Sequence, residues 1–219
     1  MDWFRQVNNY CERTDFSYWS EPVNALTNLA FVLAGLWALR LAARSGDNGA
    51  RVLSVCLIAI GIGSWLFHTH AQIWSLMADV IPILVFILAY VYLATVRFFA
   101  LPLWAGALAV IVYIPYSSAF TGVFEPIVGN LNGSMSYMPV PVLILAYAAI
   151  LRNRRRETAK GLAIGASILF ASLFFRTVDE AICPTFPLGT HFLWHILNAV
   201  MLGWMIRVMV EDRRAFPAH

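Results

Sequence analysis

Three histidines in apolar stretches of the chain have the residue type and the spacing of a metal site. His191 and His195 lie four residues apart in HFLWHILN, at the start of one apolar stretch, and His68 closes another in GIGSWLFH. Residues four apart share one face of a helix. Because an ionisable side chain inside a membrane is costly unless it is paired or ligated, these histidines are candidate functional residues.

This donor set predicts a zinc site. Neutral imidazoles suit zinc, and three protein ligands leave a fourth position open for water, as in catalytic sites. Taken alone, the His191 and His195 pair also fits interhelical hydrogen bonds or axial haem ligation. Other polar residues lie close in the sequence, however. Ser64 precedes His68 by four residues, and Asp79 precedes Pro82 at the start of the next apolar stretch.

Together these side chains predict a hydrolysis. Zinc lowers the pKa of a water molecule that it coordinates. We expect Asp79 to accept a proton from that water and to return it to a leaving amine, and Ser64 to hydrogen-bond the developing oxyanion. A lipid amide is the natural substrate class for such a site in a membrane protein.

The composition indicates helices that span a membrane and position these residues. Of the 219 residues, 60% are hydrophobic and 12% are charged, whereas about a quarter of the residues of a soluble domain are charged. Seven nearly uncharged stretches approach the roughly 20 residues that cross a bilayer: residues 25–39, 52–67, 77–96, 101–116, 137–151, 161–175 and 192–210. They are apolar on all sides, unlike the alternating strands of a barrel. We therefore predict an all-α, seven-helix bundle.

We expect one domain over residues 1–219, with an exterior segment at 1–23, the helix bundle at 24–210 and a cytoplasmic tail at 211–219. Residues 117–136, between the fourth and fifth helices, are expected to form the longest exterior loop.

Basic residues predict the orientation in the membrane. They follow alternate helices and gather on one side: Arg40, Arg44, Arg51, Arg97, Arg152, Arg154, Arg155, Arg156, Lys160, Arg207, Arg213 and Arg214. By the positive-inside rule this side is cytoplasmic, so the amino terminus is outside and the carboxyl terminus inside. The three histidines and Asp79 then fall toward the outer side. The membrane is expected to be a bacterial inner membrane with a periplasmic site, or an endomembrane in a eukaryote.

Several motifs, taken together, resemble the alkaline ceramidase family of seven-helix membrane amidases. They are CER and EPVNALTN before and within the first helix, GIGSWLFH, Asp79-Val-Ile-Pro82 and HFLWHILN, and the similarity covers Tyr10–Asn198. The resemblance implies a zinc ion held by His68, His191 and His195, with Asp79 and Ser64 in the catalytic site. The implied reaction hydrolyses the N-acyl bond of ceramide to a sphingoid base and a free fatty acid.

The family resemblance also implies a calcium site before the first helix. Glu12 and Glu21 match its acidic ligands, and hard oxygen ligands suit calcium. Asn9, Tyr10 and Thr14 fall on its other positions, but Asn9 replaces an acidic residue and Thr14 an amide, so the charge is lower. In the alternative interpretation Glu12 and Glu21 form ion pairs with one of two basic residues, Arg13 or Arg176.

Two exterior cysteines are expected to form a disulfide. Cys11 and Cys183 lie in segments that the site would bring together, and an oxidising exterior permits the bond. The expected partner of the protein is a ceramide-like membrane lipid, with no nucleic acid and no obligatory protein partner.

Two other functions stay open. One is zinc hydrolysis of another N-acyl or ester lipid. The other is a lipid receptor or transporter of the progestin and adipoQ receptor type, which shares the serine, aspartate and histidine arrangement. Those receptors resemble the chain less in the CER and EP segment, and they place the amino terminus in the cytoplasm.

Overall fold

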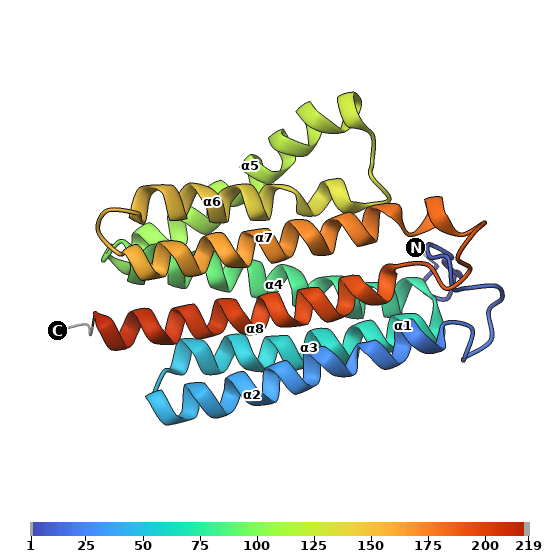
Figure 1. Ribbon diagram of the computed structural model, residues 1–219, viewed down its shortest axis with the longest axis horizontal. Coiled ribbons are helices and arrows are strands. Elements are labelled where there is room, and N and C mark those ends of the chain that lie inside the picture. The colour runs from blue at the N-terminus through green and yellow to red at the C-terminus, as the bar shows by residue number, and fades with distance from the viewer. Residues whose placement is uncertain (1, 217–219) are drawn as a thin grey trace.

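The computed structural model describes residues 2–216, which form a bundle of nearly parallel and antiparallel helices (Figure 1). Within this part of the chain, seven helical spans are long and apolar enough to cross a membrane. Apart from one isolated bridge between Gln6 and Gln72, no β-structure forms among these residues. The predicted all-α, seven-helix fold is confirmed, and the protein is an integral, multi-pass membrane protein.

The spans follow one another with short connections. In chain order they are α1 (Pro22–Thr27) with α2 (Leu29–Ser45), α3 (Asn48–His70), α4 (Ile73–Phe98), α5 (Leu103–Val128), η1 (Ser134–Tyr137) with α6 (Pro139–Leu151), α7 (Arg156–Val178) and α8 (His191–Ala215), with the short η2 (Glu180–Ile182) between the last two. Because α8 continues to Ala215, most of the expected tail at 211–219 is helical, and residues 217–219 lie outside the described residues.

The prediction of an exterior loop at 117–136 is wrong for residues 117–128, because α5 continues to Val128. Pro115 and Pro126 lie inside this helix. Membrane helices tolerate proline, since neighbouring groups and local adjustments satisfy the freed carbonyls, and the helix keeps the other backbone groups paired. Figure 1 shows the end of α5 leaning away from the other helices. Because the helix ends at Val128, the connection to the next span is short and begins at Gly129.

The histidines lie at the end of the bundle opposite to most of the basic residues. The N-terminal segment, the α3–α4 turn and the α7–α8 connection gather at one end, and the α2–α3, α4–α5 and α6–α7 connections gather at the other (Figure 1). Helix α8 packs against α2, α3 and α7, and it is the most buried span. The central position of α8 places the side chains of its first two turns inside the protein.

Asp47 holds the end of the bundle that is remote from the histidines. Its fully buried carboxylate caps α3 by accepting the backbone N–H of Ala50 at 3.0 Å. It also accepts two hydrogen bonds from Arg97, at 2.7 and 2.9 Å. Burial by itself would raise the pKa of this carboxyl, but the hydrogen bonds and charge of Arg97 outweigh it and hold the pKa below its usual value.

This lowered pKa makes Asp47 a source of acid-sensitive stability. The contribution is fully present above the unfolded pKa of about 3.9 and is lost as the pH falls through the lower folded value. We expect Asp47→Asn to cost about 2 kcal/mol at neutral pH and to flatten the loss of stability in acid. Thermal unfolding in detergent between neutral and acid pH measures both effects. Glu157→Gln, at an exposed side chain of the same end, is the control; equal stability of the two variants at neutral pH would contradict the prediction.

Candidate metal centre

The three predicted histidines come together inside the bundle. His68 comes from the last turn of α3, and His191 and His195 come from the first two turns of α8. One ring nitrogen from each lies within 4.8 Å of the other two. All three side chains are buried, with exposed fractions of 1–2%. The spacing lets one ion contact all three rings after small side-chain adjustments.

Two of these rings are oriented by hydrogen bonds at their far nitrogen. His68 Nδ1 lies 2.6 Å from a carboxylate oxygen of Glu21, which only accepts, so Nδ1 donates. His195 Nδ1 lies 3.0 Å from Thr27 Oγ1, whose hydroxyl donates to the Val23 carbonyl at 2.8 Å and therefore accepts from the imidazole. Such outer partners select the tautomer of metal-binding histidines and leave Nε2 free as a ligand.

The nitrogens left over fit a metal ion. His68 Nε2, His191 Nδ1 and His195 Nε2 are all buried, and none has a hydrogen-bond partner within the described residues. Unpaired polar atoms are rare in protein interiors because burying them without a partner costs free energy. Such atoms on all three histidines of one small cluster fit a metal ion, and imidazole nitrogens are donors that zinc prefers.

Ser64 and Asp79 also lie at this cluster, as the sequence predicts. A side chain at Gly63 would overlap the carbonyl oxygen of Ala78, so this glycine lets the backbones of α3 and α4 approach closely. That approach places Ser64, which is buried, next to Asp79 in the second turn of α4. Asp79 is also near enough to His68 for a Coulombic interaction. All five residues predicted for the zinc site are therefore neighbours.

The N-terminal segment covers the histidines. The ring of Tyr10 stacks on that of His191, with centroids 3.7 Å apart, and lies 5.1 Å from that of His68. Burial raises the pKa of the Tyr10 phenol, so its hydroxyl stays neutral. The predicted disulfide between Cys11 and Cys183 is confirmed, and it ties this segment to the connection between α7 and α8.

Asp179 is a positioning residue that the sequence interpretation missed. Its fully buried carboxylate accepts the backbone N–H groups of Thr190 and His191 at 2.7 and 2.9 Å, and that of Cys11 at 3.0 Å. A carboxylate at a helix N-terminus pairs the free amides and complements the helix dipole. Asp179 thus holds both the first turn of α8 and the N-terminal segment, but in the sequence it is one acid among several in a connection.

The residues expected to bind calcium have protein partners instead. Glu21 forms a buried ion pair with Arg13, which also donates to the His68 carbonyl at 2.8 Å. Glu12 accepts the backbone N–H groups of Val23 and Asn24 at the start of α1, at 2.7 and 2.8 Å. The other expected ligands do not complete a site: Tyr10 stacks on His191, and Asn9 and Thr14 are exposed. This arrangement does not fit calcium. For Glu21 the structure instead shows the alternative interpretation, an ion pair with Arg13.

We expect added calcium to leave the thermal stability of the protein unchanged. An ion that binds the folded state alone stabilises it by RT ln(1 + [L]/Kd), but here the guanidinium of Arg13 already occupies the carboxylate of Glu21. Thermal unfolding of the purified protein with and without calcium measures this effect. Magnesium at the same concentration controls for ionic strength. A higher unfolding temperature with calcium but not with magnesium would contradict this prediction and support a calcium site.

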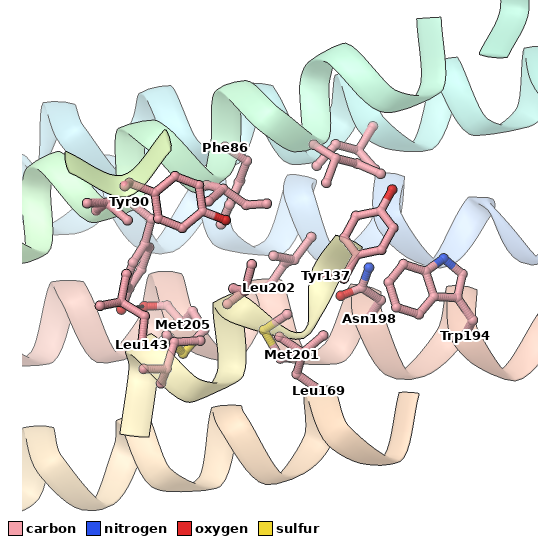
Figure 2. A pocket seen from close by; sticks show the side chains of 17 residues that line it. Phe86, Tyr90, Tyr137, Leu143, Leu169, Trp194, Asn198, Met201, Leu202 and Met205 are labelled. Atoms are coloured by element: carbon pink, nitrogen blue, oxygen red, sulfur yellow. Dashed lines mark hydrogen bonds between the residues drawn. The ribbon is translucent and has the colours of Figure 1, made fainter. Parts of the chain in front are cut away.

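An apolar cavity begins beside the histidines and continues into the bundle. Trp194 and Asn198, which flank His195 on α8, lie at one end of it with Tyr137, and Tyr90 and Met205 lie at the other (Figure 2). At a rise of 1.5 Å per residue, the stretch of α8 from Trp194 to Met205 is about 16 Å long. The lining of the cavity is therefore mostly apolar and extends along several turns of α8, as suits an alkyl chain.

These features define a membrane protein with a buried histidine site at the head of an apolar cavity. The family model described as Ceramidase matches residues 7–213, and the chain belongs to the ceramidase family. A search of curated proteins found no match. The family predicted from the motifs is thereby confirmed.

Proposed function

We propose that this protein is a zinc-dependent intramembrane amidase that hydrolyses the N-acyl bond of ceramide to a sphingoid base and a free fatty acid. The observation that carries the proposal is the set of three buried histidine nitrogens without partners, beside Asp79 and Ser64, in a chain of the ceramidase family. His68, His191 and His195 are the proposed zinc ligands, and Asp79 and Ser64 are the proposed catalytic residues.

Each side chain has a definite part in the proposed reaction. A bound zinc ion supplies a Lewis acid that makes water a nucleophile at neutral pH. Asp79 accepts a proton from the attacking water and delivers it to the leaving nitrogen, so water is added across the C–N bond. Ser64 donates a hydrogen bond to the oxygen of the former amide carbonyl while it carries negative charge.

The surrounding residues orient the histidines, cover the cluster and make room for the alkyl chain of the substrate. Glu21 and Thr27 orient two of the histidines, and Tyr10 with the disulfide-bonded segment covers the cluster from outside. The cavity behind Trp194 takes an alkyl chain of the substrate. Because water and lipid must both reach the scissile bond, a site at one end of the bundle suits the reaction better than one at the bilayer centre.

The proposal includes an orientation. The basic end of the bundle faces the cytoplasm, by the positive-inside rule, and the histidine end and the amino terminus face the exterior. The whole chain acts as a single domain with a ceramide-like lipid as partner, in a bacterial inner membrane with the site toward the periplasm or in an endomembrane.

Product analysis by mass spectrometry tests the function directly. Purified protein incubated with ceramide should release sphingoid base and fatty acid in equal amounts, and a zinc chelator should stop the release. Another N-acyl or ester lipid cleaved in place of ceramide would keep the hydrolase but change its substrate. Saturable ceramide binding without any product would replace the enzyme by a receptor or transporter.

A further inference from the structure

One charged side chain at the histidine end has no part in the function proposed above. Arg176 lies in the last turn of α7, and its Nε and Nη1 atoms are buried without a hydrogen-bond partner among the described residues. A guanidinium stays charged and carries five N–H donors and no acceptor. Burying such donors unpaired is costly, so a ligand that accepts from them is expected.

The carboxylates of the N-terminal segment and of the α7–α8 connection do not supply that acceptor. Glu21 pairs with Arg13, and Glu12 accepts two backbone amides of α1. Asp179, three residues farther along the chain, accepts three backbone amides. Asp79 is near enough for a Coulombic interaction, but it leaves Nε and Nη1 of Arg176 unpaired.

Three aromatic rings surround the guanidinium. Its Cζ lies 5.5 Å from the ring centroids of Tyr137 and Trp194 and 6.0 Å from that of Tyr10. These ring faces stabilise a cation, but they do not pair its in-plane N–H groups. Tyr137 and Trp194 also line the histidine end of the apolar cavity (Figure 2), while Tyr10 stacks on His191. Arg176 therefore lies where the cavity meets the histidine cluster.

We propose that Arg176 binds the carboxylate of a fatty acid whose alkyl chain occupies the cavity. The inference rests on the proposed function, because amide hydrolysis at the histidines converts a neutral group into a carboxylate at this point of the molecule. Arginine binds carboxylates through two parallel N–H···O bonds, and the buried, unpaired Nε of Arg176 can donate one of them. An alcohol or an amide of the same chain length offers no charge and binds less tightly.

Binding of matched lipids to the purified protein tests this inference without any turnover. Dodecanoate and dodecanol share the alkyl chain and differ in the charged head, and dodecyl phosphate tests for an anionic head group of another kind. We expect wild-type protein to prefer dodecanoate over dodecanol by about tenfold or more, the scale of a charge-assisted bidentate contact. Arg176→Gln should lose that preference, with little change for dodecanol. Arg207→Gln, an exposed arginine on α8 paired with Glu211, is the matched control.

Each outcome decides the point. The assignment would be overturned if Arg176→Gln lost the same affinity for dodecanoate as for dodecanol, or lost none for either. A loss of affinity confined to dodecyl phosphate would also overturn it. If Arg176→Gln does not fold, the wild-type comparison suffices, since equal binding of acid and alcohol overturns it too. The proposed function is judged separately by ceramide products: hydrolysis without acid preference rejects the role of Arg176, and acid preference without hydrolysis rejects the amidase.

Discussion

Replacing His195 with alanine is expected to remove both the bound zinc and the hydrolysis of ceramide. Its Nε2 is one of the three unpartnered ring nitrogens, and the opposite nitrogen is held by Thr27. Loss of an outer hydrogen-bond partner alone typically costs 10- to 100-fold in metal affinity or activity, so loss of the ligand itself should cost more than about 100-fold. Elemental analysis and ceramide turnover of the same preparation measure the two effects together.

The chain provides graded controls for this experiment. His70→Ala removes a histidine two residues from His68 that lies outside the cluster, and it should keep full zinc content. Thr27→Val removes only the partner of His195, so its zinc affinity should fall between those of wild type and His195→Ala. Stoichiometric zinc in a variant lacking His68, His191 and His195 together would show that the metal binds elsewhere.

Replacing Asp79 with asparagine should instead separate catalysis from metal binding. The amide keeps the size of the carboxylate but cannot accept the proton of the attacking water. General acid–base catalysis contributes about 10²- to 10⁴-fold, so turnover should fall within this range while zinc content and thermal stability are retained. Single-turnover assays on metal-loaded protein measure the loss.

The control for this variant is Asp15→Asn, the same chemical change at an exposed carboxylate of the N-terminal segment. It should hydrolyse ceramide like wild type. Undiminished turnover by Asp79→Asn would remove Asp79 from the role of base, and loss of zinc in this variant would assign it to metal binding instead.

Much of the architecture could be predicted from local features of the chain. A helix satisfies its own backbone groups, so seven apolar stretches in a membrane protein suffice to predict seven helices. The spacing of His191 and His195 places them on one helix face. Most basic residues follow every second helix, which predicts that they gather at one end of the bundle. The failure at α5 has the same local origin: prolines usually end helices in water, but Pro115 and Pro126 lie within a helix here.

The sequence alone determined the helical fold and the candidate site residues His68, His191, His195, Ser64 and Asp79, because these depend on residue type and on spacing along single helices. Only the tertiary structure decided which acids pair with which groups. In the folded protein Glu21 pairs with Arg13 and His68, and Asp179 accepts backbone amides at the start of α8. The Nε and Nη1 atoms of Arg176 have no acceptor among the described residues. Hydrogen bonds and ion pairs between distant segments act over a few ångströms, and packing of the whole bundle sets those distances.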